Sequence, residues 1–380
     1  MSQSQSQSQP HSQSHPDKGG AADHDKQPKI LYLSFNQEYN CISCGTSQGF
    51  VIYNIDPFKV RYQQTFGKGI GIAELFYTSN LIGLVGGGDD PKFPTNKLVI
   101  WDDFQAKKVA DIDAEHRILG VQFNKECFVI VCQNSIKFYQ FKDMSFLKKI
   151  DTCDNPNGVC ALSVNENAQI AVCPSEKPGY VNIVNYANGT VKSMKCHDNV
   201  ITRITLNSDA TKFVTASAQG TLVRVFDLPT QTKFRELRRG SDTCDIYAAH
   251  FSKNSKCLAV TSNKNTIHIF SLCKEYTNTT SNLKPLSLFS GFFNSEWSLF
   301  SIPWNENGPQ HNPDALENKH ICAIPICDEK DEVYKVFVIG YDGNFVTYQF
   351  KFNPDKLEKL KSGSLFQLET ITPNEIPKSK

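Results

Sequence analysis

Short runs of alternating apolar and polar residues fill the chain between about residues 29 and 352, and Gly, Asn, Asp or Ser bounds each run. β-Branched and aromatic residues are frequent inside the runs, which is typical of β-strands. Apolar residues at helical spacing are nearly absent from this region. The pattern therefore predicts an all-β fold.

One six-residue signature recurs, in which a turn residue is followed by an apolar-x-apolar-aromatic sequence. Its seven copies begin at residues 50, 98, 136, 181, 222, 267 and 345, so five of the six intervals lie between 38 and 48 residues. One four-stranded propeller blade has about this length, roughly 40–45 residues in WD-type repeats. Seven copies predict a seven-bladed β-propeller of the WD-repeat type. The alternative, a β-sandwich with long loops, does not explain a repeated third strand.

The two ends of the chain differ in composition from the repeats. Residues 1–28 contain no aromatic and no branched apolar residue, so we expect a disordered tail rich in Ser and Gln. The Lys-rich stretch 353–380 predicts a second tail, which leaves 29–352 for the propeller. The last interval is longer because residues 273–320 contain an insertion, and its first part, about 273–296, is expected to form a loop.

Composition narrows the possible functions. A net charge of +1 disfavours a general electrostatic binder of nucleic acid. The polar N-terminus has no leader pattern, so we expect the 13 cysteines to be reduced in the cytoplasm. No apolar run approaches the roughly 18–20 residues of a spanning helix, so any membrane role should be peripheral. We expect a monomer.

Signals for metal, cofactor or catalysis are weak. Cys41 and Cys44 form half of a zinc or redox motif, but no second pair stands at a suitable spacing. The glycines at 86–88 lack the Gly-Lys-Ser/Thr of a phosphate-binding loop. A hydrolase would need convergent carboxylates or histidines at the central channel, and the sequence shows no such set. We therefore expect no metal, no cofactor and no catalytic residue.

Two adjacent arginines, Arg238 and Arg239, stand in what should be the outer strand of the fifth blade. Neighbouring side chains of a strand point to opposite faces, so the pair should serve two ligands rather than one. The planar guanidinium suits phosphate because it donates two parallel hydrogen bonds. Alternatively, both are surface arginines paired with Glu236 or Asp242.

Tight turns in the fifth and sixth blades carry similar polar residues. In each, a Ser and a Thr four residues apart frame the turn, and a basic or imidazole side chain follows. Hydroxyls, turn amides and one cation make a suitable anion pocket; alternatively, the hydroxyls bond their own turns and the histidine caps a strand. The residues are Ser217, Thr221 and Arg224 in the fifth blade, and Ser262, Thr266 and His268 in the sixth.

These segments resemble the PROPPIN family of β-propellers, which bind polyphosphoinositides, and within it the WIPI group. LRRG at 237–240 is similar to the family's Phe/Leu-Arg-Arg-Gly signature, and 218–227 and 263–270 are similar to the segments around it. Residues 84–103 resemble the second blade of the branch that contains the fourth human WIPI protein. The resemblance covers about residues 30–352.

The resemblance implies two headgroup pockets on either side of the arginine pair. The implied ligands are phosphatidylinositol 3-phosphate and phosphatidylinositol 3,5-bisphosphate. Cys196-His197 stands where the family has Ala-His. The first pocket would use His197, Thr215, Ser217, Thr221, Arg224 and Arg238, and the second Arg239, Ser262, Thr266 and His268.

The insertion carries a cluster of apolar side chains after a polar lead. In the family this blade-six loop inserts into the bilayer, as an aromatic loop tip at the interface would. Alternatively, it packs as a strand against its own blade. The residues are Leu286, Leu288, Phe289, Phe292 and Phe293.

A second surface is implied at the first turn of blade one. In the matching branch, polar residues of this turn contact the large bridge-like lipid-transfer protein of autophagy, and Asn36 and Glu38 occupy the matching positions. An ordinary hairpin turn is the alternative.

The resemblance implies a non-enzymatic phosphoinositide effector of autophagy. It would be recruited from the cytoplasm to preautophagosomal, phagophore and endosomal membranes, where it would recruit lipid-transfer machinery to the forming autophagosome. The alternative is a WD-type scaffold that binds peptides or phosphopeptides without lipid selectivity.

Overall fold

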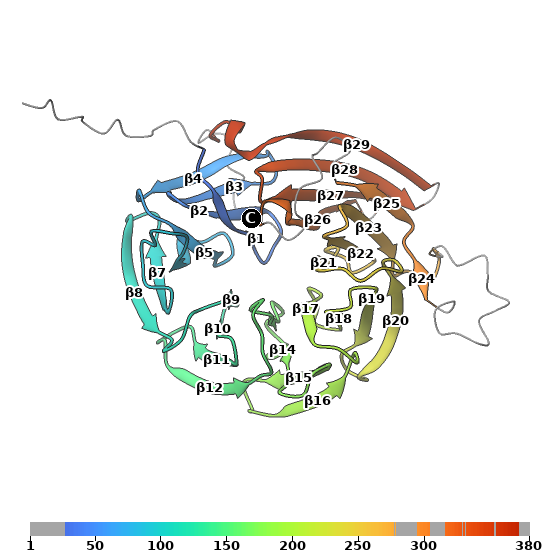
Figure 1. Cartoon of the computed structure of the whole chain (residues 1–380), viewed down its shortest axis with the longest axis horizontal. Coiled ribbons are helices and arrows are strands. Elements are labelled where there is room, and N and C mark those ends of the chain that lie inside the picture. The colour runs from blue at the N-terminus through green and yellow to red at the C-terminus, as the bar shows by residue number, and fades with distance from the viewer. Residues whose placement is uncertain are drawn as a thin grey trace, which may run out of the picture.

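Seven antiparallel β-sheets stand in a ring around a central axis (Figure 1). The computed structural model describes residues 27–276, 278, 295–304, 316–328, 330, 332–352 and 355–371. Six sheets contain four strands, and the sheet of blade five contains a fifth, β24 (Glu296–Trp297), which pairs with its edge. Within each blade the strands run from the axis to the rim (Figure 1). This is the seven-bladed propeller that the repeat predicts.

Blades one to four take up the first half of the chain. Blade one comprises β1 (Ile30–Phe35), β2 (Cys41–Thr46), β3 (Gly49–Asn54) and β4 (Lys59–Thr65), and blade two β5 (Ile70–Leu75), β6 (Leu81–Gly86), β7 (Lys97–Asp102) and β8 (Lys107–Asp113). Blade three comprises β9 (Gly120–Phe123), β10 (Cys127–Val131), β11 (Ser135–Gln140) and β12 (Phe146–Asp151), and blade four β13 (Ala161–Leu162), β14 (Ile170–Pro174), β15 (Tyr180–Asn185) and β16 (Val191–Lys195).

Blades five to seven complete the ring. Blade five comprises β17 (Ile201–Leu206), β18 (Lys212–Ser217), β19 (Leu222–Asp227) and β20 (Thr232–Arg238), and the short β24 (Glu296–Trp297) pairs with its edge. Blade six comprises β21 (Ile246–Phe251), β22 (Cys257–Ser262), β23 (Thr266–Ser271) and β25 (Phe300–Pro303). Blade seven comprises β26 (His320–Asp328), β27 (Val333–Gly340), β28 (Asn344–Phe352) and β29 (Asp355–Ser364). Two 3₁₀ turns, η3 (Leu316–Asn318) and η4 (Leu365–Gln367), flank blade seven.

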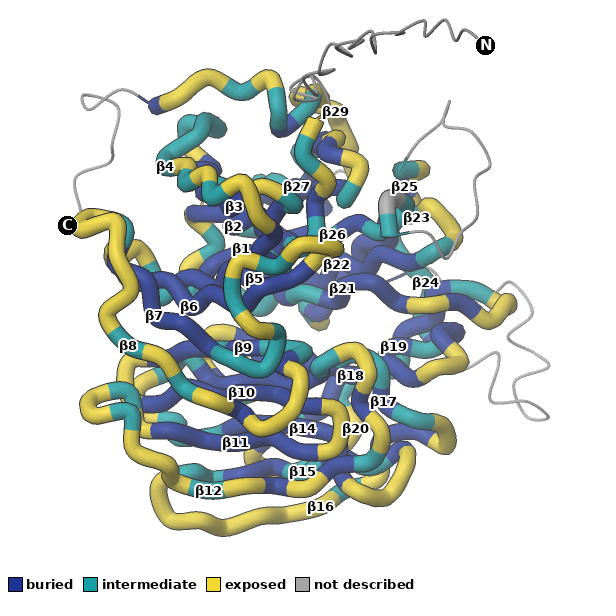
Figure 2. Tube along the Cα trace, turned by 60° about the vertical axis from the view of Figure 1, so that its left-hand side comes forward, coloured by how far each residue is buried: buried dark blue, intermediate teal, exposed yellow. Residues whose placement is uncertain are grey.

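All seven copies of the sequence signature lie on the third strand of a blade, and this explains their regular spacing. Third strands are covered on both faces by neighbouring blades, whereas the outermost strands are largely exposed (Figure 2). The signature is therefore apolar and aromatic because its strand is buried.

The hydrophobic core is divided into seven clusters, one between each pair of adjacent blades. Between blades five and six, for example, Val223 and Leu237 pack with Val260 and Phe270. Cys41 and Cys44 of β2 illustrate the same division, since Cys41 lies in the cluster with blade two and Cys44 in the cluster with blade seven. Each blade therefore buries the apolar side chains of both its faces against its two neighbours, and its stability depends on them.

The C-terminal stretch is part of the propeller, so the predicted tail at 353–380 is wrong for residues 355–371. β29 is the outer strand of blade seven and pairs along its length with β28. An outer strand needs no apolar face, because it is exposed to water on its outer side. The Lys-rich sequence DKLEKLKSGS therefore gave no apolar alternation by which to recognise it.

Residues 365–371 close the ring. After β29 the chain turns onto blade one, where the Val60 amide donates to the Glu369 carbonyl (2.9 Å) and the Ile371 amide to the Val60 carbonyl (2.8 Å). Leu365 is buried in the cluster between blades seven and one. The segment from η4 to Ile371 thus joins the last blade to the first.

Two expectations fall on parts of the chain outside the described residues. They are the N-terminal tail, of which the structure describes only residues 27 and 28, and the apolar side chains at 286–293. Among the described residues, no helix has the length and apolar character needed to cross a membrane.

Candidate functional site

Arg238 and Arg239 lie at the end of β20 and are buried, each only 7% exposed. The Arg238 guanidinium lies against the Ser295 hydroxyl (3.4 Å), which follows the long blade-six connection. The Arg239 guanidinium turns the other way, where Nε donates to the Gly220 carbonyl (3.4 Å) and Nη2 to the Asp242 carbonyl. The two neighbours therefore face different surroundings, and neither is a surface arginine.

The first cluster lies across blade five. Thr215, Arg224 and Glu236 occupy matching positions on β18, β19 and β20, so their side chains form one row. The His197 Nε2 is 2.9 Å from the Thr215 hydroxyl, and Arg224 Nη1 donates to the Cys196 carbonyl (2.6 Å). The structure thus brings together His197, Thr215 and Arg224, as the resemblance implied.

The turn between β18 and β19 lies beside Arg239. Ser217 and Thr221, which frame it, are both buried. The Arg239 amide donates to the Thr221 carbonyl (3.0 Å), and Gly220 accepts from the Arg239 side chain. Gly220 has a positive φ of 65° and its missing side chain leaves room for the Cys244 carbonyl, so a Cβ there would clash. The backbone of this turn therefore holds Arg239 in place.

The second cluster lies on the second and third strands of blade six and on the residues just before β25. Ser262 and Thr266 are paired across the β22–β23 turn, and the Thr266 hydroxyl is 3.0 Å from His268 Nε2. The other ring nitrogen of His268, Nδ1, is 3.0 Å from the Ser298 hydroxyl. Burial, together with the nearby charge of Arg239, lowers the pKa of His268 to about 4. The predicted second set of residues is thus contiguous.

Three polar side chains of these clusters were not among the predicted site residues. Glu236 accepts from Arg224 Nε (2.9 Å), although the sequence suggested it only as a partner of the arginine pair. Ser295 and Ser298 come from the far end of the blade-six insertion and reach Glu236 and His268. The sequence offered no signal for the serines, because an insertion hides which residue returns to the blade.

The blade-one turn has two different kinds of side chain. Asn36 is 2% exposed, and its side chain is bonded to Asn40, to the Cys41 amide and to the Tyr77 carbonyl of blade two. Glu38 is exposed and accepts a bond from Asn40 (2.9 Å). Asn36 therefore holds the turn, and Glu38 is the accessible one of the two.

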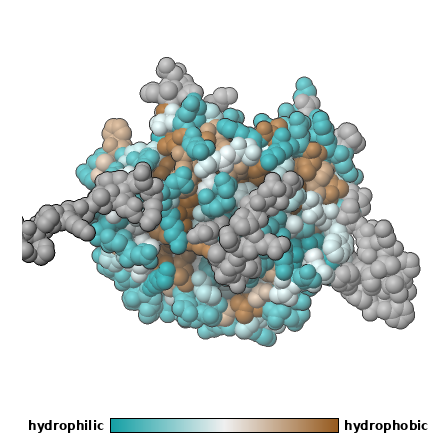
Figure 3. All heavy atoms as spheres, turned by 45° about the horizontal axis from the view of Figure 1, so that its top comes forward, coloured by the Kyte–Doolittle hydropathy of each residue, from teal (hydrophilic) through white to brown (hydrophobic). Residues whose placement is uncertain are grey.

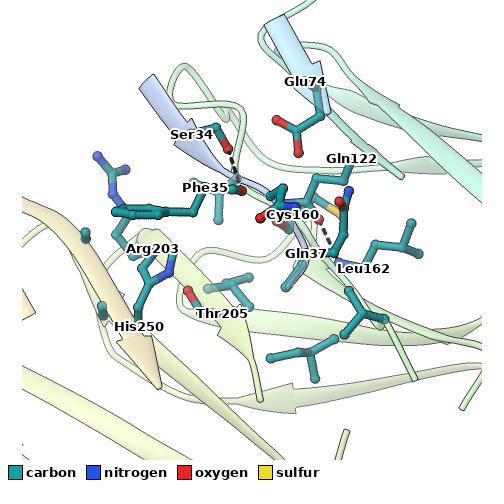
Figure 4. Close-up of a pocket in the computed structure, with 18 of the residues that line it drawn as sticks. Ser34, Phe35, Gln37, Glu74, Gln122, Cys160, Leu162, Arg203, Thr205 and His250 are labelled. Atoms are coloured by element: carbon teal, nitrogen blue, oxygen red, sulfur yellow. Dashed lines mark hydrogen bonds between the residues drawn. The ribbon is translucent and has the colours of Figure 1, made fainter. Parts of the chain in front are cut away.

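The central channel has a cavity of about 300 Å³ (Figure 4). Its polar side chains mostly bridge adjacent blades: Gln122 bonds the backbone of Cys160 and Leu162, and Arg203 bonds the Tyr247 carbonyl. Glu74, whose pKa burial raises to about 7, accepts from the Tyr32 hydroxyl (2.5 Å). The contacts of these side chains therefore point to a structural role, in which they link adjacent blades of the propeller.

The outer surface is mainly hydrophilic on the side seen in Figure 3, with apolar side chains confined to narrower areas. Single apolar side chains on a surface are ordinary. The arginine clusters are therefore a stronger candidate for a functional site than any apolar patch in that view.

Comparison with known proteins matches residues 30–300 to the family described as PROPPIN. SVP1-like protein 2 of Neurospora crassa is 34% identical over 246 residues, which cover 64% of this chain and 56% of that protein. Autophagy-related protein 18 of Yarrowia lipolytica is 34% identical over 266 residues, covering 64% of this chain and 66% of that protein. The matched region therefore spans less than two thirds of either relative's own length.

Solved structures show the same fold. Kluyveromyces lactis Hsv2 superimposes with a TM-score of 0.72 at 21% identity, over 89% of this chain and 100% of that one. At 21% sequence identity, the similarity shows a common fold.

Proposed function

The chain belongs to the PROPPIN family of autophagy-related β-propellers, and we propose that its two arginine clusters bind 3-phosphorylated phosphoinositides at membranes. The observation that supports this most directly is the arginine pair itself. Two adjacent buried arginines lie beside hydroxyl and imidazole groups: Arg238 is 3.4 Å from the Ser295 hydroxyl, and burial together with the charge of Arg239 lowers the pKa of His268. The hydrogen bonds of the Arg239 side chain go to backbone carbonyl groups. Burying a cation is costly unless an anion compensates for its charge.

The two clusters suit phosphate esters rather than carboxylates alone. Each combines a planar guanidinium with hydroxyl or imidazole donors, and a phosphate monoester offers three acceptor oxygens to them. The ligands we propose are phosphatidylinositol 3-phosphate and phosphatidylinositol 3,5-bisphosphate, bound through His197, Thr215, Ser217, Thr221, Arg224 and Arg238 in the first pocket and Arg239, Ser262, Thr266 and His268 in the second.

Two weak sites on one rigid body would act together. A hydrogen bond to a charged group nets only about 1.5–3 kcal/mol, so one pocket binds reversibly. Linked sites raise overall avidity by about 10²–10⁴-fold when both can engage one surface. The apolar residues 286–293 would add insertion into the interface. Docking would then be stable only where the lipid is dense.

We further propose a non-enzymatic role in which the docked propeller recruits a bridge-like lipid-transfer protein to preautophagosomal, phagophore and endosomal membranes. Glu38 is the better contact of the two turn residues, because its side chain is exposed while that of Asn36 is engaged inside the protein. Whether this chain belongs to the branch of the fourth human WIPI protein stays a prediction.

The experiment is vesicle co-sedimentation with and without 3-phosphorylated phosphoinositide, using the wild type and the double variant Arg238→Thr/Arg239→Thr. We expect selective wild-type binding and at least a roughly tenfold loss in the variant, since two charge-assisted contacts are removed. Arg117→Thr is the matched control, because Arg117 is exposed in the connection to blade three. Equal binding by a folded double variant would refute the site, and absence of lipid selectivity in the wild type would favour the peptide scaffold.

A further inference from the structure

The first cluster contains a carboxylate at its centre. Glu236 Oε2 accepts from Arg224 Nε (2.9 Å) and from Lys233 Nζ (2.9 Å), and Oε1 accepts from the Ser295 hydroxyl (3.2 Å). Its side chain is 18% exposed. Burial alone would raise the pKa of Glu236, but the hydrogen bonds from Lys233 and Arg224 hold it below the usual value. The group is therefore an anion at neutral pH.

A phosphate that bound Arg224 through Nε would have to take the place of this carboxylate. Nη1 of the same guanidinium already donates to the Cys196 carbonyl. A phosphate that approached Arg224 while Glu236 stayed in place would meet a like charge at close range in a partly desolvated site. Ligand and carboxylate therefore compete for one cation.

The second cluster has no such competitor among the residues that the structure describes. The hydrogen bonds of the Arg239 side chain go to the carbonyl groups of Gly220 and Asp242, which carry no net charge. His268 is bonded to the hydroxyls of Thr266 and Ser298. The two clusters are therefore electrostatically unequal.

The blade fold itself does not require a carboxylate at this position. In blade three, the equivalent third-strand cation is Lys137, and the residue opposite it on the outer strand is Lys149. Lys137 takes its carboxylate partner from Glu115, which lies in the connection between blades and is exposed. A glutamate opposite Arg224 is thus a local feature of blade five.

We propose that Glu236 is a built-in counter-ion of the first pocket, which a phosphorylated headgroup must displace from Arg224 before it can bind there. This inference rests on the proposed function. Lys233 already holds the same carboxylate oxygen and is half exposed, so it can keep Glu236 after Arg224 is released. The second pocket fills first, and the first pocket engages only at higher lipid density. Glu236 therefore sets the density at which the propeller docks with both pockets.

The test is the binding of Glu236→Gln to vesicles that carry phosphatidylinositol 3-phosphate. Glutamine keeps the shape and can still accept from Arg224, but it has no charge to compete with phosphate. We expect about two- to fivefold tighter binding, the scale of one partly exposed ion pair. Glu115→Gln is the matched control, because Glu115 pairs with Lys137 (2.8 Å) of blade three and not with Arg224. It should bind as the wild type does.

A double-variant cycle assigns the effect to the first pocket. The gain from Glu236→Gln should persist when Arg239→Thr disables the second pocket and vanish when Arg238→Thr disables the first. If Glu236→Gln does not fold, Glu236→Asp, whose shorter side chain reaches Arg224 poorly, should give a smaller gain. Unchanged or weaker binding by a folded variant would overturn the inference while selective wild-type binding still supports the proposed function. No selective binding by the wild type would overturn both.

Discussion

At the scale of single residues, the site is built from groups whose charge state depends on their surroundings. Burial, followed by the nearby Arg224 charge, lowers the pKa of His197 to about 4, and His268 has the same value for the same kind of reason. Both imidazoles are therefore neutral at physiological pH in the ligand-free protein. They can serve as hydrogen-bonding groups, and a bound anion would make protonation easier.

We predict that headgroup binding is coupled to proton uptake. The negative charge of the phosphate should raise the pKa of His197 and His268, so affinity should increase as the pH falls from about 7.5 to about 6. Calorimetry of a soluble inositol phosphate in buffers of different ionisation enthalpy measures the protons taken up. The double variant His197→Gln/His268→Gln should lose this uptake, leaving only the titration of the phosphate itself, whereas His116→Gln, an exposed histidine, should keep it. Equal proton uptake by the wild type and the double variant would contradict the coupling.

At the scale of elements, the outermost strands determine which segments complete each blade and which residues contact the blade edges. β24 pairs in parallel with β20 beside Arg238, so the returning limb of the blade-six connection becomes a fifth strand of blade five. Glu296 on β24 accepts from Arg235 and from Asn278, which anchors this limb. β29 and the residues that follow it likewise complete blades seven and one.

We predict that the segment 365–371 is required for full stability. A chain that ends at residue 371 is the reference. A chain that ends at 364 loses the bonds to Val60 and the burial of Leu365 and Ile371. Burying one such side chain is worth about 1.5–3 kcal/mol, so we expect a midpoint at least about 5 °C lower. Thermal unfolding followed by circular dichroism measures the midpoint, and equal midpoints for the two truncations would contradict a stabilising role of residues 365–371.

At the scale of the whole molecule, stability depends on seven inter-blade interfaces that close on one another. Buried histidines from different parts of the ring contribute to its pH dependence. His197, His250, His268 and His320 all have their pKa lowered to about 4, with burial as the main cause. In the unfolded chain each titrates near 6.5. Between these values the unfolded state binds more protons than the folded state.

We predict that the propeller loses stability as the pH falls from about 6.5 to about 4. The stabilising contribution of a neutral buried histidine is complete above pH 6.5 and disappears as the pH falls through this window. Glu74 opposes the trend, because its raised pKa of about 7 lets the folded state bind one proton there. Four histidines outweigh one carboxyl, so the urea midpoint should fall between pH 7 and pH 5. A urea midpoint that stays constant between pH 7 and pH 5 would contradict the conclusion that the buried histidines are neutral in the folded protein.

The arginine pair shows how far local patterns reach. Strand alternation predicted that Arg238 and Arg239 have different surroundings, and their hydrogen-bond partners do differ. The binding role of the pair stays a prediction. Contacts between distant segments could not be read in this way. Glu236 meeting Arg224, and Ser295 and Ser298 returning from a long insertion, depend on how blades five and six pack.

The sequence by itself determined the number and order of the blades. Each third strand is buried between neighbours, so its apolar signature repeats once per blade and is legible locally. Only the tertiary structure decided the outer strand β29, the closing segment 365–371 and the charge partners at the site. Exposed strands carry no apolar pattern, and a salt bridge between two strands depends on their register and on side-chain direction. These are properties of the assembled ring, and no local run of residues encodes them.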